Sequence, residues 1–184
     1  MTDRLGPLAP HQLSEAQQAA AQAVIDGPRG AVYGPFIPLL RSPELMQCAQ
    51  QLGEYLRYRS AIGNRLSEMA ILVTAREWNQ QVEWAIHAPI AERCGIAADV
   101  IEAIANRRRP QNMLVDEELV YDFCIELHRN KRVSDAIWGD AVALFGEKGV
   151  VDLMGINGYY TLLAMVMNGA QTAVPSFELA RLPD

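Results

Sequence analysis

Residues 64–94 read NRLSEMAILVTAREWNQQVEWAIHAPIAERC, and this stretch decides the fold of the chain. Its apolar residues recur at helical spacing on both sides of Asn79, so the pattern predicts two helices joined by a short turn. Asn64 is a suitable N-cap for the first helix, which we expect to end near Trp78. The second helix is expected over 80–94. Two helices with so short a connection pack antiparallel, as a helix-turn-helix hairpin.

Helical periodicity continues over almost the whole chain, and no run alternates between apolar and polar residues as a strand would. We therefore expect an all-α helical bundle built around the hairpin. No second domain boundary is evident, so residues 1–184 are predicted to form one domain, with an N-terminal helix and loop over 1–42, a core over about 43–168 and a tail over 169–184. The further helices are expected over 13–26, 43–59, 98–106, 116–130, 134–145 and 147–168.

The helix expected over 43–59 has a clear start, because Ser42 can cap it and Pro43 fits the first helical position. Asp116 offers a similar cap to a later helix. The apolar side of the 43–59 helix is predicted to consist of Leu45, Cys48, Ala49, Leu52, Tyr55 and Leu56. The glycines and prolines over 30–38 predict an irregular loop that lies across the helices.

Composition narrows the range of functions. Sixteen basic and twenty-two acidic residues give a formal charge of −6, which argues against broad binding to nucleic acid or to an anionic membrane surface. The first residues include no apolar segment of the secretory type, so a cytoplasmic location is expected. The three cysteines are widely spaced, which favours reduced thiols. The apolar stretch 150–167 contains Asp152 and Asn157 and is short for a membrane span, so we interpret it as a buried helix.

The hairpin brings candidate catalytic residues together. Glu83 and His87 are four residues apart, a spacing that places their Cβ atoms roughly 5–6 Å apart on a helix. Glu68 stands in an otherwise apolar run, at a similar distance before Asn79 as His87 after it, so the two can meet across the hairpin. A carboxylate beside an imidazole is suited to proton transfer, because imidazole titrates near neutral pH.

Four motifs follow one another along the chain: RLSEMAILVTAR at 65–76, EWAIH at 83–87, FGEKGVVDL at 145–153 and GYY at 158–160. In this order they resemble the carboxymuconolactone decarboxylase family, whose relatives include the alkylhydroperoxidase D-like proteins. The resemblance covers roughly residues 35–168. It implies the alkylhydroperoxidase D-like fold and a homo-oligomer, a trimer or hexamer with a dimer as a further possibility. We expect the contact to involve the apolar C-terminal helices.

In the peroxidase branch of this superfamily, a glutamate is followed by a Cys-x-x-Cys pair and then by a histidine. The resemblance places the glutamate at Glu68 and the histidine at His87, and it places Gln80 and Glu83 at the two cysteine positions. A thiolate is the nucleophile in peroxide reduction, and neither an amide nor a carboxylate can replace it. An alkylhydroperoxidase-type peroxidase is therefore the disfavoured alternative.

The decarboxylase branch implies a cofactor-independent lyase that acts on a small carboxylated lactone. The substrate loses carbon dioxide, its electrons move into the conjugated lactone carbonyl and a proton returns to carbon, so no pyridoxal, thiamine or metal is required. His87 is the expected general acid, oriented by Glu83 or Glu68. Arg76 is the expected partner of the substrate carboxylate, with a surface salt bridge as its alternative role. Trp84 is expected either to wall the pocket or to belong to the core.

Other functions fit parts of the same pattern. A metal could be bound by Glu68, Glu83 and His87, although zinc sites of this size usually contain more histidine or cysteine. Glu83 and His87 could also form only an ordinary hydrogen bond between two side chains of one helix. Cys124 and His128 could form a thiol nucleophile pair or belong to an inward helix stripe. A non-catalytic protein for ligand binding or assembly is a further alternative. A passive apolar pocket has no need of clustered ionisable groups, so convergence of the three side chains would favour an enzyme.

Overall fold

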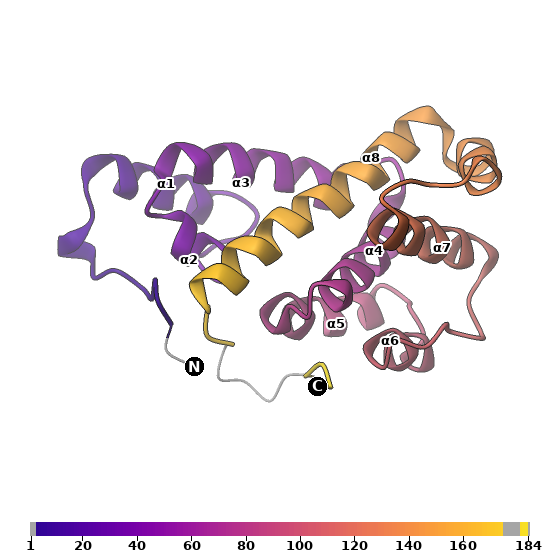
Figure 1. The fold of residues 1–184 in the computed structure, drawn as a ribbon. Helices are drawn as coiled ribbons and strands as arrows, with labels where there is room; N and C mark the ends of the chain where they lie inside the picture. Colours follow the sequence, from indigo (N-terminus) through magenta and orange to yellow (C-terminus); the bar gives the residue numbers. More distant parts are fainter. Residues whose placement is uncertain (1–2, 175–180, 184) are drawn as a thin grey trace.

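The computed structural model describes residues 3–174 and 181–183, and within these ranges it contains helices and connecting loops but no strand. The expected all-α fold is therefore confirmed. The elements in chain order are the 3₁₀ turn η1 (Pro10–Gln12) and the helices α1 (Glu15–Asp26), α2 (Phe36–Leu39), α3 (Pro43–Tyr58), α4 (Gly63–Glu77), α5 (Gln81–Arg93), α6 (Ala98–Ala105), α7 (Val115–Asn130) and α8 (Asp135–Ala170) (Figure 1).

Helix α4 lies at the centre of the molecule. Every residue from Leu66 to Arg76 is buried. Helices α5, α7 and α8 provide most of the cover, and α3 and α6 complete it. A helix that is enclosed on all sides must be apolar almost all round, and α4 meets this requirement except at a few positions such as Glu68. That carboxylate is consequently held deep inside the protein.

Helix α8 runs diagonally across α3 and α4 and carries much of the remaining core (Figure 1). It is interrupted at Gly146, where φ is 67° and ψ is 168°. Glycine adopts this conformation without a steric penalty, and the break separates the two segments that the sequence predicts over 134–145 and 147–168. By length and composition alone α8 could cross a membrane, a test that the core helix of a soluble protein also passes, and 56% of its apolar window is buried inside this chain.

The predicted apolar side of α3 is only partly correct, because Ala49 and Leu56 are buried but three other members are exposed. Leu45 is 45% exposed and Leu52 47% exposed, and Cys48 is exposed as well. The buried face instead consists of Met46, Ala49, Gln50, Gly53 and Leu56. The reason is the glycine at its centre: a Cβ atom at Gly53 would lie 2.1 Å from the Tyr159 hydroxyl oxygen of α8. Because there is no side chain at this position, α8 packs closely onto this face.

Of the three predicted N-caps, Ser42 does occupy the N-cap position of α3, with Pro43 at the first helical position as expected, although its side chain makes no capping hydrogen bond. The predicted caps at Asn64 and Asp116 are wrong. Helix α4 already begins at Gly63, and Asp116 pairs with Arg65 instead. Local sequence suggested caps at Asn64 and Asp116, but α4 starts before Asn64, and Asp116 lies inside α7 and forms an ion pair.

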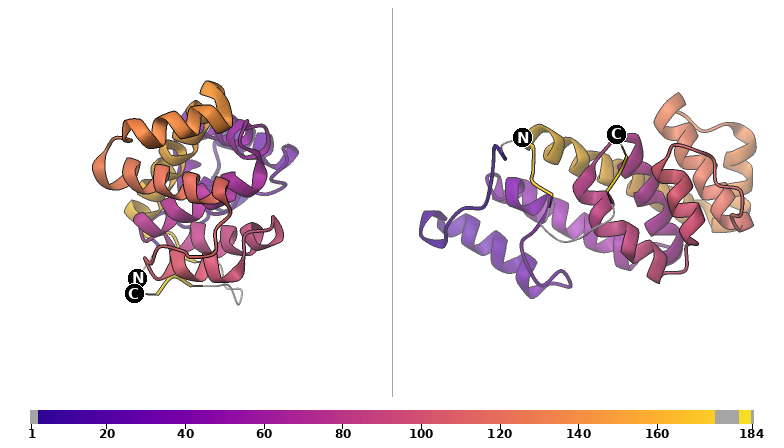
Figure 2. Two further views of the ribbon diagram at one scale, coloured as in Figure 1. Left: turned by 90° about the vertical axis from the view of Figure 1, so that its right-hand side faces the viewer. Right: turned by 90° about the horizontal axis from the view of Figure 1, so that it is seen from below.

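The molecule is elongated, with α1 and α3 at one end and α6 and α7 at the other (Figure 2). The N-terminal segment reaches the end of α8, where the Arg4 amide donates to the Ala170 carbonyl at 2.9 Å. Residues 181–183 return to the hairpin, and the Gln81 side chain exchanges two hydrogen bonds of 3.0 Å with the backbone of Leu182. Residues 175–180 and 184 of the expected tail lie outside the described residues.

Candidate active site

The hairpin turn places the candidate residues, and Gln80 shapes this turn. Asn79 adopts a left-handed conformation with φ of 49°. The Gln80 side-chain oxygen then accepts hydrogen bonds from the amides of Val82 at 2.6 Å and Glu83 at 3.3 Å, which caps the start of α5. Its amide nitrogen donates to the side-chain oxygen of Asn168 at 2.8 Å. The glutamine at the first cysteine position of the resembled peroxidases therefore has a structural role here.

The three predicted catalytic side chains converge across the hairpin. His87 Nδ1 and Glu68 Oε2 are 2.6 Å apart, and His87 Nε2 and Glu83 Oε2 are 3.3 Å apart. All three side chains are at most 4% exposed. Each imidazole nitrogen thus faces a different carboxylate, one from α4 and one from α5.

The electrostatic environment keeps His87 protonated. Burial lowers the pKa of the imidazole, but the negative charges and hydrogen bonds of Glu68 and Glu83 outweigh burial and raise the pKa to about 9. At neutral pH His87 is therefore an imidazolium that donates through both nitrogens. Arg57 adds a second cation, with its Nε 3.7 Å from Glu68 Oε1. Two acidic and two basic groups balance one another, as buried charges must.

A small cavity of about 20 Å³ adjoins this cluster. A space of this size holds about one water molecule. Its lining comes from the loop before α2, from the start of α2, and from α3, α5 and α8: Arg29, Tyr33, Pro35, Phe36, Arg57, Glu83, Ile86, His87, Tyr159, Tyr160 and Leu163. The ring of Tyr160 meets the imidazole edge-on, with centroids 5.2 Å apart. Glu68 is not among the lining residues, so it holds His87 from behind while Glu83 borders the cavity.

Two buried polar atoms of the cavity lining have no hydrogen-bond partner within the described part of the chain. They are Glu83 Oε1 and the hydroxyl oxygen of Tyr159. Burial raises the pKa of Tyr159, so its hydroxyl stays protonated and can donate. Unsatisfied buried polar atoms are rare in proteins, and beside a cavity they offer hydrogen bonds to a ligand.

Arg76 and Trp84, the residues predicted to contact substrate, do not line this cavity. The Arg76 guanidinium lies at the end of α4, where it donates to Asn79 Oδ1 at 2.9 Å and to the Pro183 carbonyl at 3.1 Å. Trp84 is 1% exposed and belongs to the core cluster. Glu68, Glu83 and His87 of the same hairpin do come together, but the side chains of Arg76 and Trp84 lie away from them.

Sequence reasoning missed the cationic side of the cavity. Arg57 follows Gly53 by one helical turn on α3, and Arg29 lies in the preceding loop with its guanidinium 4.8 Å from the Phe36 ring centroid. The glycine inside a predicted helix was the available signal, because such a residue often marks a close approach. A Cβ at Gly53 would also lie 2.7 Å from Arg29 Nη2.

The other candidate chemistries find less support in the geometry. Both nitrogens of His87 already face carboxylates, and the described residues contain no group of three or more His, Cys, Asp or Glu side chains arranged to hold a metal ion. Burial raises the pKa of Cys124 to about 12, so its thiol is protonated. His128 Nε2 lies 3.0 Å from Thr74 Oγ1, which leaves Cys124 without a histidine base.

Comparison with known proteins identifies the fold. No protein-family model matches the chain, and no curated protein matches it in sequence. Two solved structures are similar over 94% of this chain, each with a TM-score of 0.73. One is an uncharacterized peroxidase-related protein from Silicibacter sp. TM1040, with 13% identity over 90% of its length. The other is an alkylhydroperoxidase AhpD core protein, also described as uncharacterized and peroxidase-related, from Ralstonia eutropha JMP134, with 16% identity over 92% of its length. The chain thus has the AhpD-like all-α fold.

Proposed function

We propose that the protein is a cofactor-independent decarboxylase of a small carboxylated lactone, with His87 as the general acid. One observation carries this proposal: a buried imidazole with a pKa of about 9 lies between two carboxylates at the edge of a cavity. An acid with this pKa is fully protonated at neutral pH and can deliver its proton to a carbanionic product. Positioned acids of this kind contribute about 10²–10⁴-fold to reaction rates.

The two nitrogens of the His87 imidazole have different roles in the proposed reaction. The bond between the ring carbon and the carboxylate breaks, carbon dioxide leaves, and the electron pair moves into the conjugated lactone carbonyl. Protonation at carbon then uses the Nε2 proton of His87, because Nε2 faces Glu83 and the cavity. Glu68 is a positioning residue that holds Nδ1 at 2.6 Å. A proton from water then returns the imidazole to the imidazolium form, which the Glu83 carboxylate stabilises, and the unpartnered Glu83 Oε1 can accept a hydrogen bond from the substrate.

Arg57 and Arg29 take the role that the sequence suggested for Arg76. Both line the cavity, and a guanidinium there can bond a substrate carboxylate and stabilise negative charge on the lactone oxygen. The cavity of about 20 Å³ is too small for a lactone, so the segment with Tyr33 and Phe36 has to move when substrate enters. Gly30 lies just before this segment and Gly34 lies within it, and both have positive φ.

The test measures carbon dioxide release from 4-carboxymuconolactone by the purified protein. His87→Gln is expected to lower kcat by at least about 100-fold, in line with loss of a general acid. That variant leaves two buried carboxylates with one fewer cation, which can destabilise the fold. The double variant His87→Gln/Glu83→Gln removes one charge of each sign and therefore serves as the control with balanced buried charge. Wild-type-like turnover by the folded double variant would refute the role of His87, and no turnover of this or related butenolides by the wild type would refute the proposed reaction.

The rival peroxidase activity is tested in the same preparation with organic hydroperoxides and a thiol reductant. We expect no turnover, since Cys48, Cys94 and Cys124 form no pair and the cysteine positions of the resembled peroxidases hold Gln80 and Glu83. Hydroperoxide consumption that persists in a variant without cysteines would point to a different mechanism. Consumption that depends on one cysteine would favour the peroxidase.

A further inference from the structure

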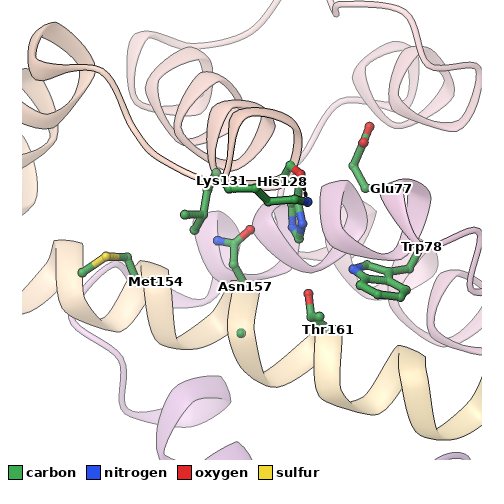
Figure 3. Close-up of a pocket in the computed structure, with 9 residues that line it drawn as sticks. Glu77, Trp78, His128, Lys131, Met154, Asn157 and Thr161 are labelled. Atoms are coloured by element: carbon green, nitrogen blue, oxygen red, sulfur yellow. Dashed lines mark hydrogen bonds between the residues drawn. The ribbon is translucent and has the colours of Figure 1, made fainter.

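A groove of about 620 Å³ lies apart from the His87 cavity and shares no lining residue with it. It is formed by the ends of α4 and α7 and by the middle of α8 (Figure 3). Sites for small molecules have volumes of about 300–1,000 Å³, so the groove has a suitable size. We propose that it binds a small aromatic carboxylate that also carries a hydroxyl group. This inference does not depend on the proposed decarboxylase activity.

The charge of the groove favours an anion. Its one acidic lining residue, Glu77, is held by Arg129 through contacts of 2.7 and 3.3 Å and lies 3.7 Å from Arg107 Nη1. Lys131 lines the groove just after the end of α7 and has no ion pair with a described acidic residue. It donates one hydrogen bond to the His128 carbonyl, which leaves two N–H groups for a ligand carboxylate.

His128 supplies an acceptor for a ligand hydroxyl. Burial lowers the pKa of its imidazole, so the ring is neutral at pH 7. Thr74 has one hydroxyl proton, and its two other neighbours, the Ala70 carbonyl at 2.9 Å and Asn157 Oδ1 at 3.3 Å, can only accept. These neighbours favour the tautomer in which His128 Nε2 donates to Thr74 Oγ1 at 3.0 Å. In this tautomer Nδ1 is unprotonated and can accept a hydrogen bond from a ligand.

The walls of the groove suit a flat ring. Trp78 and Met154 provide apolar surfaces on two elements, and Gly158 presents no side chain between them. A Cβ atom at Gly158 would meet no other atom within 4 Å, so packing inside the chain does not require this glycine. A glycine inside a helix costs about 1 kcal/mol relative to alanine, and close approach of a ligand is one reason to retain it.

Isothermal titration of the full chain with 4-hydroxybenzoate tests the proposal. We expect saturable binding at one site per chain, and at least tenfold weaker binding of benzoate and of 4-hydroxybenzamide, which each lack one of the two groups. Gly158→Leu fills the groove and Lys131→Gln removes its free cation, so each is expected to weaken binding of 4-hydroxybenzoate at least tenfold. Gly139→Leu is the matched control, because Gly139 is also an exposed α8 glycine with no atom within 4 Å of a Cβ and does not line the groove.

The outcomes separate this site from the His87 cavity. His87→Gln should bind 4-hydroxybenzoate with wild-type affinity, even where it abolishes turnover. Absence of binding to the wild type, unchanged binding to Gly158→Leu, or loss of binding in His87→Gln would each overturn the proposal. Failure of the decarboxylase assay alone would leave it standing, since the two measurements use different ligands and different variants.

Discussion

At the scale of the residue, His87 links stability to pH. Its folded-state pKa of about 9 lies above the ordinary value of 6.5, so the folded protein holds a proton that the unfolded chain releases between these values. The contribution is complete below pH 6.5 and is lost as pH rises through 9. A shift of this size corresponds to about 3 kcal/mol. We predict that the free energy of unfolding, measured with urea, falls by this order between pH 6 and pH 10.

The matched control for this titration is His87→Gln/Glu83→Gln, which has no imidazole at the site but keeps the buried charges balanced. Its free energy of unfolding should vary much less with pH over the same interval. An equally steep fall in the double variant would show that other groups, such as lysines or tyrosines, cause the pH dependence. The unfolding measurements would then not support a raised pKa for His87.

The two carboxylates are predicted to differ in their effect on His87. Glu68 is nearer to the imidazole than Glu83, at 2.6 Å compared with 3.3 Å, and its charge is the strongest of the influences that raise the pKa. Glu68→Gln should therefore lower the His87 pKa more than Glu83→Gln does, as followed by NMR titration of the imidazole. The basic limb of the pH–rate profile should move in the same order. Equal shifts would contradict the distinction between a positioning carboxylate and one that borders the cavity.

At the scale of the element, Gly53 is predicted to be intolerant of a methyl group. Alanine in place of glycine inside a helix ordinarily stabilises by about 1 kcal/mol. Here the added carbon would lie 2.1 Å from the Tyr159 hydroxyl oxygen and 2.7 Å from Arg29 Nη2, so both side chains must move. We expect Gly53→Ala to destabilise by about 1–3 kcal/mol in urea unfolding and to lower turnover, because both side chains line the cavity.

Gly158→Ala is the control for that prediction, because a Cβ at Gly158 meets no neighbour within 4 Å on the same kind of helix. It should be neutral or slightly stabilising. If Gly53→Ala were equally well tolerated, the close packing of α8 on α3 could not explain why the buried face of α3 is centred on Gly53.

The positions of the helices could be predicted from the sequence more accurately than the face that each helix buries. The hairpin of α4 and α5 follows from periodicity and from Gly95, whose φ of 101° ends α5 as a glycine can. The meeting of Glu68 and His87 follows from their similar distances to the turn at Asn79. The orientation of α3 does not follow, because periodicity favours the side with Leu45 and Leu52 and is silent about a glycine contact with α8.

At the scale of the whole molecule, the site is closed by a segment distant in sequence. Arg29 and Phe36 come to the cavity from about 50 residues before His87. Their arrival depends on how the loop before α2 packs on α3 and α8, a long-range contact that helical spacing and composition do not encode. This is why the sequence pointed to Arg76, which is next to the predicted acids along the chain, whereas the arginines that line the cavity are Arg29 and Arg57.

The exposed side of α3 leads to a prediction about assembly. Leu45, Cys48 and Leu52 follow one another at helical spacing, and the two leucines are 45% and 47% exposed in the single chain. Helix α8, where the sequence suggested a contact, buries Leu153 and Leu163 inside the chain but leaves Trp138, Leu144, Val151 and Met165 exposed, so a contact through α8 remains a prediction as well. A row of exposed apolar side chains is typical of an interface. We therefore predict that the protein forms a homo-oligomer through α3.

Size-exclusion chromatography with light scattering at micromolar concentration measures this assembly. Leu45→Glu/Leu52→Glu should dissociate the oligomer, since two carboxylates would be buried without partners. Val115→Glu is the matched control, because Val115 is 81% exposed on α7 and lies outside the α3 row. Its mass should equal that of the wild type. A monomeric wild type would refute the predicted assembly. If only Val115→Glu dissociated the oligomer, the interface would lie on α7 and not on α3.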